Sequence, residues 1–101
     1  MDPVRSERYI EYEVSEYAEK VKGCLVLKLN VWGRIGWPDR LYIHYRKVMF
    51  VEFKKDRAVP RKIQDYIHGK IRDHGIPVRV VDNVSDGKAI IDQFTEGSTH
   101  V

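Results

Sequence analysis

The feature that most constrains the fold is a pair of β-rich runs, Asp39 to Tyr45 and Val48 to Lys54, with only Arg46-Lys47 between them. Runs rich in β-branched and aromatic residues with two residues between them predict a β-hairpin, although this link lacks the usual Asn-Gly pair. The hairpin would form the antiparallel part of a larger sheet.

The segment before the hairpin predicts one helix and one strand. The helix should run from about Arg5 to Lys22, with Ser6 or Pro3 marking its start and Gly23 its end. Its apolar residues recur at helical spacing and form one stripe: Ile10, Val14, Tyr17 and Val21. A strand from Cys24 to Leu29 should follow, and then a loop from Asn30 to Pro38 that contains Gly33 and Gly36.

The segment after the hairpin predicts two helices and a fourth strand. Pro60 can open a helix that carries Ile63, Ile67 and Ile71 on one stripe and stops before Gly75. We then expect a strand from Pro77 to Val81, a helix from Ser85 to Phe94 and a frayed tail from Thr95 to Val101. The order α-β-β-β-α-β-α predicts an α/β or α+β fold with a mixed four-stranded sheet flanked by helices.

Size and composition exclude several classes of protein. The 101 residues are enough for one domain, predicted to span residues 1–101, and the hydrophobic fraction of 43% allows an ordinary core. The net charge of +3 is compatible with a nucleic-acid partner without establishing one. Cys24 is the only cysteine, so no internal disulfide can form. No apolar run reaches the ~20 residues that span a bilayer, and no hydrophobic signal region begins the chain. We therefore expect a cytoplasmic protein.

Three charged residues near the ends of the hairpin strands carry the chemical argument. Glu52 and Lys54 are two residues apart, so their side chains leave the same face of a strand. If the turn holds an even number of residues, Asp39 pairs with Lys54 and shares that face. Apolar residues would then form the floor of the site: Leu41, Ile43, Val48 and Phe50.

Two carboxylates and a lysine at one place suit metal-assisted phosphodiester chemistry. Carboxylate oxygens chelate a hard cation such as Mg²⁺, which activates water and polarises a phosphodiester. The lysine neutralises charge that develops on the phosphate or orients the attacking water. The alternative is an ordinary surface ion pair between a lysine and neighbouring carboxylates, which spacing alone favours.

The context of these residues resembles a known family. A Gly33-Arg34-Ile35-Gly36-Trp37-Pro38-Asp39 loop leads into the acid, a strand ends Glu52-Phe53-Lys54, and Pro60-Arg61-Lys62-Ile63-Gln64 begins a helix. Together with Ser6-Glu7, these segments resemble the VRR-NUC family, a branch of the PD-(D/E)XK nuclease superfamily found in phages and in repair enzymes. The resemblance runs from Ser6 to about Val81 and implies a restriction-endonuclease-like core. Its location would be the cytoplasm of a bacterial host, from a phage or prophage gene.

The resemblance also implies roles for individual residues. Asp39 and Glu52 would bind Mg²⁺ or Mn²⁺ together with the Phe53 carbonyl, Lys54 would be the catalytic lysine, and Gln64 would position the site or the DNA. Many family members have Gly or Val before the proline, whereas this chain has Trp37. That ring either stacks on a base or caps the core, and we favour the core.

The first helix should contribute one further acid. At about 100° per residue, Glu7 lies roughly 50° from the centre of the apolar stripe, Glu13 about 70° and Glu11 about 90°. Glu7 is therefore the acid turned most toward the sheet, and it also matches the Ser-Glu start of the family. Glu11 is the next candidate, and Glu16 should face solvent.

Basic residues surround the predicted site: Lys28, Arg34, Arg40, Lys55, Arg61 and Lys62. As a group they favour contacts with DNA phosphates, although each alone could be ordinary solubilising charge. The four histidines, among them His44 and His68, lack the spacing of a zinc site and should be structural or exposed.

The predicted function is a metal-dependent endonuclease on branched DNA. The stand-alone, one-domain members of the family resemble Holliday-junction resolvases, and two opposed cuts would favour a two-fold homodimer. The first helix and the outer face of the hairpin are the candidate interfaces, the latter formed by Tyr42, His44, Met49 and Val51. The alternatives are a nuclease on flap or linear DNA, a monomer that nicks one strand at a time, and a non-catalytic nucleic-acid-binding module.

Overall fold

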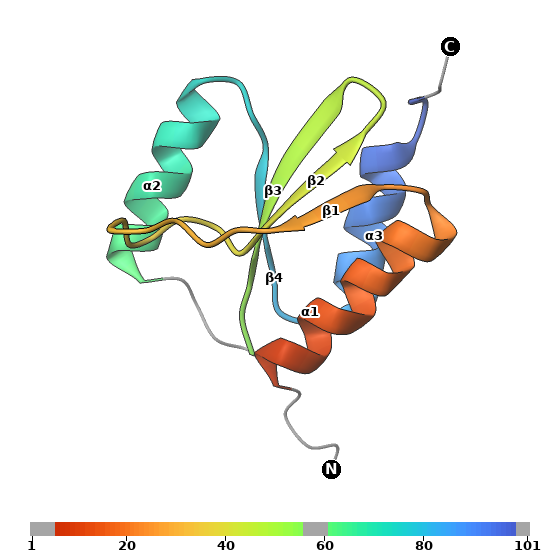
Figure 1. Cartoon of the computed structure of the whole chain (residues 1–101), viewed down its shortest axis with the longest axis horizontal. Helices are drawn as coiled ribbons and strands as arrows, with labels where there is room; N and C mark the ends of the chain where they lie inside the picture. The colour runs from red at the N-terminus through yellow and green to blue at the C-terminus, as the bar shows by residue number, and fades with distance from the viewer. Residues whose placement is uncertain (1–5, 56–60, 99–101) are drawn as a thin grey trace.

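The computed structural model describes residues 6–55 and 61–98. In chain order its elements are α1 (Glu7–Glu16), which continues as a π-helical turn (Tyr17–Val21), β1 (Leu25–Lys28), β2 (Arg40–His44), β3 (Lys47–Phe53), α2 (Lys62–Asp73), β4 (Val78–Val81) and α3 (Val84–Thr95) (Figure 1). The predicted order is confirmed, with bounds that differ by a residue or two. Pro3, Arg5, Pro60 and the last three residues lie outside the described ranges. None of the described helices is long and apolar enough to cross a membrane.

The four strands form one mixed sheet in the order β1-β2-β3-β4. The β1–β2 and β2–β3 pairs are antiparallel, and β4 lies parallel to β3 after the crossover through α2. This is the α/β fold with a mixed four-stranded sheet that the sequence predicts. The parallel pair brings the end of β3 next to β4, with the Lys54 N–H donating to the Val81 carbonyl at 2.9 Å.

The main core lies between one face of the sheet and the helices α1 and α3, which Figure 1 shows on the side of the strands opposite α2. Ile10 and Val14 of α1 and Ile91 of α3 are fully buried in it. The sheet contributes the residues that we predicted on the outer face of the hairpin: Tyr42, His44, Met49 and Val51, all buried. The prediction of a subunit interface on that face is therefore wrong, because α1 and α3 already cover it.

The two helices pack closely because α3 presents a glycine to α1. A Cβ added at Gly87 would lie 2.4 Å from a methyl carbon of Val14 and 3.0 Å from one of Val81. No side chain fits that space, so Gly87 sets the distance between α1, α3 and β4. On the sheet side, the hydroxyls of Ser15 and Tyr42 hydrogen-bond at 2.9 Å inside the core.

The π-helical turn changes which residues of the first helix face the core. A π turn inserts one extra residue, so the apolar stripe beyond Val14 moves by about one position. Ala18 is fully buried, Tyr17 is half-buried against the core, and Val21 is 65% exposed. The predicted stripe is therefore correct for Ile10 and Val14 and wrong for Val21.

The hairpin turn consists of Tyr45 and Arg46, one residue earlier than predicted. Both have positive φ, 34° and 67°, as in the two-residue turns that match strand twist. The sequence concealed this turn because neither residue is Gly or Asn. The register pairs Arg40 with Val51, so one further step places Asp39 opposite Glu52, not opposite Lys54. The number of turn residues is still even, and Asp39 therefore shares the face of Glu52.

Candidate metal centre

Three carboxylates from three elements meet at the end of β3. Glu7 comes from the first turn of α1, where the Ser6 hydroxyl caps the helix by accepting from the Tyr9 N–H at 3.1 Å. Asp39 is the residue immediately before β2, and Glu52 is the next-to-last residue of β3. One oxygen from each side chain lies within 4.8 Å of the other two, close enough for all three to reach one ion.

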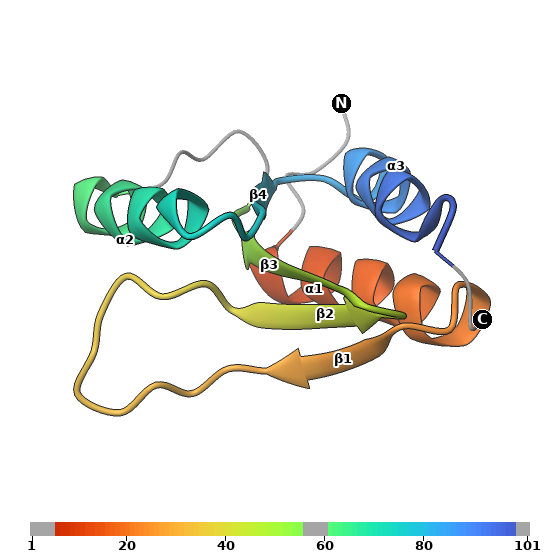
Figure 2. The same cartoon turned by 90° about the horizontal axis from the view of Figure 1, so that it is seen from above.

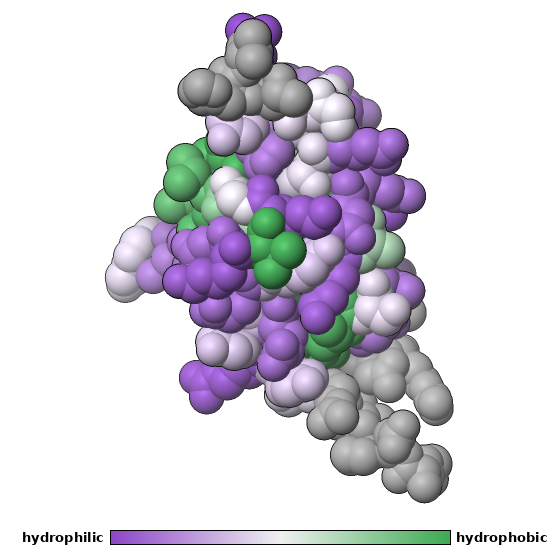
Figure 3. Space-filling view, turned by 90° about the vertical axis from the view of Figure 1, so that its right-hand side faces the viewer, coloured by the Kyte–Doolittle hydropathy of each residue, from purple (hydrophilic) through white to green (hydrophobic). Residues whose placement is uncertain are grey.

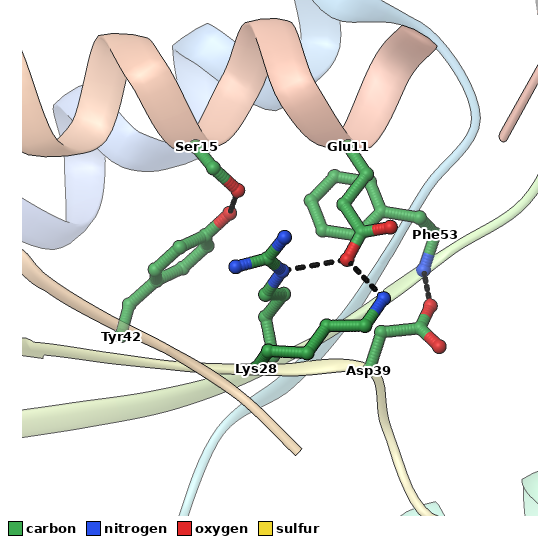
Figure 4. Close-up of polar contacts among 7 residues, drawn as sticks. Glu11, Ser15, Lys28, Asp39, Tyr42 and Phe53 are labelled. Carbon is green, nitrogen blue, oxygen red and sulfur yellow. Dashed lines mark hydrogen bonds and ion pairs between the residues drawn. The ribbon is translucent and has the colours of Figure 1, made fainter. Parts of the chain in front are cut away.

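The Asp39 carboxylate is fixed by the neighbouring strand. Its Oδ2 accepts a hydrogen bond from the Phe53 N–H at 2.8 Å, as Figure 4 shows. Burial raises the pKa of Asp39 above its usual value, and that hydrogen bond only partly opposes the shift. The loop before it ends in the buried Pro38, which fixes the approach of the chain to the strand.

Glu52 is the most buried of the three, with 2% of its surface exposed. Its Oε2 accepts from the Gln64 amide at 2.9 Å and lies 3.4 Å from the Lys54 ammonium. Its Oε1 is buried and has no hydrogen-bond partner among the described residues. Burial, with the charge of Asp39, raises the pKa of Glu52 to about 7, although Lys54 opposes the shift. The cluster is short of positive charge, since Lys54 is the only cation that contacts its acids in the described ranges.

Gln64 connects the start of α2 to this site. Its side-chain oxygen accepts from the Arg61 N–H at 2.9 Å and so caps the helix, while its NH₂ group donates to Glu52. Both ends of one amide are used, which fixes the rotamer. Gln64 therefore ties the geometry of Glu52 to the position of α2.

Glu11, the alternative acid on α1, lies in a different environment. Its Oε2 accepts from Lys28 Nζ at 2.8 Å and from Arg40 Nε at 2.6 Å (Figure 4). Burial alone would raise the pKa of Glu11, but the two cations outweigh it and hold that pKa below its usual value. Glu11 is thus already neutralised, and Glu7 is the acid of α1 that joins Asp39 and Glu52.

The predicted DNA-contacting residues fall into two groups. Lys28 and Arg40 are engaged by Glu11, with 58% and 23% of their side chains exposed. Arg34, Lys55, Arg61 and Lys62 are exposed, on the β1–β2 loop, just after β3 and at the start of α2. These four side chains lie on the segments that lead into and out of the acidic cluster.

The environments of Trp37 and His68 can also be compared with the sequence-based predictions. Trp37 is half-buried with its ring edge toward Phe50, at 6.4 Å between centroids, which supports the core interpretation. His68 is buried, and neither ring nitrogen has a hydrogen-bond partner among the described residues. Burial and the charge of Arg72 lower the pKa of His68. The sequence placed Ile63 and Ile67 toward the core, whereas His68 and Ile71 are the buried residues of α2.

The donor set fits a hard divalent cation. All three side chains offer carboxylate oxygens, and one oxygen of Glu52 is buried without a partner in the part of the chain that the structure describes. Oxygen ligands of this kind suit Mg²⁺ and Mn²⁺ far better than soft metals. A bound cation would also supply the positive charge that the cluster lacks.

Comparison with known proteins identifies the family. No family model matches the sequence, and no curated protein matches it. A solved structure described as a VRR_NUC domain superposes with a TM-score of 0.80 and 32% sequence identity, covering 89% of this chain and 99% of its own. The likeness extends over nearly the whole of both chains. The chain therefore belongs to the VRR-NUC family and is a nuclease domain.

Proposed function

We propose that this protein is a metal-dependent DNA endonuclease. The observation that carries the proposal is the convergence of Glu7, Asp39 and Glu52 within 4.8 Å, with one buried carboxylate oxygen that no described residue partners. In a nuclease domain, such a set of acids is expected to hold the ion that assists phosphodiester hydrolysis. Glu7, Asp39 and Glu52 would hold Mg²⁺ or Mn²⁺, with the Phe53 carbonyl as a further ligand.

The bound ion would lower the pKa of a water molecule and polarise the scissile phosphate. The residues of the chain would then orient the reactants. Lys54 Nζ, 3.4 Å from Glu52, can donate to the phosphate or to the attacking water. Gln64 holds Glu52 in place through its amide, so we assign it a positioning role.

DNA is the proposed substrate, and exposed cations supply most of its affinity. Arg34, Lys55, Arg61 and Lys62 are exposed on the segments that lead into and out of the acidic cluster, and Lys28 and Arg40 add charge beside Glu11. Such residues contact phosphates without regard to sequence. A non-catalytic binding module is the second candidate, but it would gain nothing from three converging carboxylates, which repel DNA.

We further propose that the working unit is a two-fold homodimer that resolves four-way junctions. The described part of one chain offers one such acidic cluster, whereas resolution needs two cuts on opposed strands. A C₂ dimer presents two clusters related by a symmetry close to that of the junction.

The interface we favour is the face of the sheet opposite α1 and α3. Leu25 and Leu27 are 65% and 50% exposed there, and they pair with Ile43 and Leu41 of β2, which are half-buried. Figure 3 shows that the side of the molecule where α1 and α3 lie, on the right in Figure 1, is mostly hydrophilic, with only separate apolar spots. The β1–β2 face is therefore the better candidate for an apolar contact between subunits.

The test is cleavage of labelled four-way junction, flap and duplex DNA of matched sequence, with and without Mg²⁺ or Mn²⁺. We expect cutting only with a divalent ion, and faster cutting of the junction. Light scattering on the same samples gives the mass. Full activity in EDTA would refute the metal role. A monomer that cuts flaps faster than junctions would refute the resolvase assignment and leave the nuclease chemistry intact.

A further inference from the structure

The most exposed apolar side chains of the described residues lie together on the β1–β2 loop. Trp32 is 90% exposed and Ile35 is 74% exposed, more than any other large apolar residue in the described ranges. An exposed indole contributes nothing to the core and leaves a large apolar surface in water. Two such residues at one loop, with Arg34 between them, point to a surface that is covered when something binds.

The β1–β2 loop contains a defined turn and a contact with α2. The Arg34 N–H donates to the Val31 carbonyl at 3.4 Å, and Gly33 has φ +70°, so Val31 to Arg34 form a β-turn with glycine at its third position. Trp32 is therefore the second residue of the turn, at its tip. Four residues after Trp32 the chain lies directly on α2, since a Cβ at Gly36 would be 2.9 Å from the Ile63 carbonyl oxygen. The part of the loop that follows Trp32 is thus held against α2.

The same loop leads directly to the acidic cluster. Asp39 follows Trp32 by seven residues, which bounds their separation at about 25 Å even for a fully extended chain. Figure 2 shows the loop extending from the site end of β2 toward the same side of the molecule as α2. Where Gly36 contacts α2, the helix begins with the exposed Lys62, after the exposed Arg61. Asp65 is the only acid in that first turn.

We propose that Trp32, supported by Arg34 and Ile35, is a stacking element that receives an unpaired nucleobase of the DNA substrate beside the cleavage site. The inference rests on the proposed DNA endonuclease function. Indole rings stack on any base, and neighbouring cations hold the backbone while the base is unstacked. A branch point offers such bases at low cost, whereas a continuous duplex does not. The loop therefore selects branched over fully paired DNA.

Tryptophan fluorescence can report on Trp32 alone. The chain has two tryptophans, so Trp37→Phe leaves Trp32 as the only one. We would titrate that protein in EDTA with a four-way junction and with duplex of the same sequence. The Trp32 emission should be quenched by the junction and little changed by the duplex. Equal quenching by both, or none by either, overturns the proposal.

Binding measurements give the matched comparison. Trp32→Ala should weaken junction binding in EDTA by about 5- to 150-fold and duplex binding by less than about 2-fold, because stacking on one base is lost. Trp32→Phe should restore most of the loss. Tyr12→Ala, which removes another exposed aromatic ring from α1, should leave both affinities within about 2-fold of wild type. Equal weakening for both DNAs overturns the proposal.

Three results separate this inference from neighbouring ones. If Trp32→Ala changes the mass in light scattering, Trp32 is a subunit contact and the stacking role is overturned. If metal-dependent cutting is absent while junction-specific quenching persists, the proposed catalysis fails and the stacking role stands. If cutting is intact and Trp32→Ala binds both DNAs as wild type does, the stacking role fails alone.

Discussion

Two clusters of charge lie one turn apart along α1, and they differ in how their carboxylates are compensated. Glu11 accepts from two cations, and its pKa is lowered. One turn earlier, Glu7 meets Asp39 and Glu52, whose pKa values are raised. The first cluster is complete without a ligand, whereas in the second, among the described residues, only Glu52 contacts a cation, Lys54. The difference indicates that the second cluster, not the first, is built to receive a cation.

The largest expected effect is on cleavage. Asp39→Asn, Glu52→Gln and Lys54→Ala should each lower the single-turnover rate by at least ~10³-fold, because each removes a proposed metal ligand or the charge proposed to face the phosphate. DNA binding, measured in EDTA, should survive in all three. Glu11→Gln should lower the rate by no more than ~10-fold, through weaker placement of Lys28 and Arg40. An active Glu52→Gln protein would contradict the assignment.

The next effect distinguishes the acids of α1. Glu7→Gln should slow single-turnover cleavage by ~10- to 100-fold, since it removes the third carboxylate of the cluster. Glu16→Gln, on the same helix but remote from the cluster, is the matched control and should cut at the wild-type rate. If Glu7→Gln and Glu16→Gln cut equally fast, the choice of Glu7 is wrong.

How far the sequence predicts this site depends on the element. The strands and helices followed from periodicity, and Glu52-x-Lys54 shares a face by the geometry of any strand. The turn at Tyr45-Arg46 could not be predicted, because both residues adopt positive φ without Gly or Asn. Because the turn lies one residue earlier than predicted, Asp39 lies opposite Glu52 instead of Lys54, but it remains on the predicted face of the sheet.

The larger error was the prediction of which face of the hairpin is exposed. Leu41, Ile43, Val48 and Phe50 alternate with Tyr42, Met49 and Val51, so both faces are apolar and the sequence pattern cannot say which one the helices cover. The π turn at Tyr17–Val21 also has no sequence signal that we recognise. The two ion pairs of Glu11 could not be predicted without the tertiary structure, because Lys28 and Arg40 lie side by side only when β1 pairs with β2.

The pH dependence of stability should also separate the two clusters. The pKa of Glu52 is raised from 4.5 to about 7 on folding, so the folded state binds more protons between these values. Stability in EDTA should therefore fall as pH rises from 5 to 8, by on the order of 2–3 kcal/mol. Glu52→Gln should show a flatter profile in urea titrations at both pH values. The Glu11 pKa is lowered, so its contribution to stability is lost only as pH falls below the usual range of a glutamate. A wild-type profile that rises from pH 5 to 8 would contradict the burial of an uncompensated Glu52.

The smallest effect concerns the salt dependence of DNA binding. Lys62→Ala should reduce the slope of log K against log salt by about 0.9, as expected for one lost phosphate contact. Lys28→Ala should reduce it by less, because Lys28 is partly neutralised by Glu11. Affinities at four salt concentrations give both slopes. Equal slopes for the two variants would remove the distinction between the compensated and the uncompensated cluster.

The most direct test of the account is calorimetric titration of Mn²⁺ into the DNA-free protein at pH 7.5. Wild type should bind the ion at a site that includes Glu7, Asp39 and Glu52. Glu52→Gln and Asp39→Asn should lose at least ~10-fold in affinity, whereas Glu11→Gln should bind as wild type does. Binding that survives Glu52→Gln and is lost in Glu11→Gln would contradict the central claim that the uncompensated cluster is the metal site.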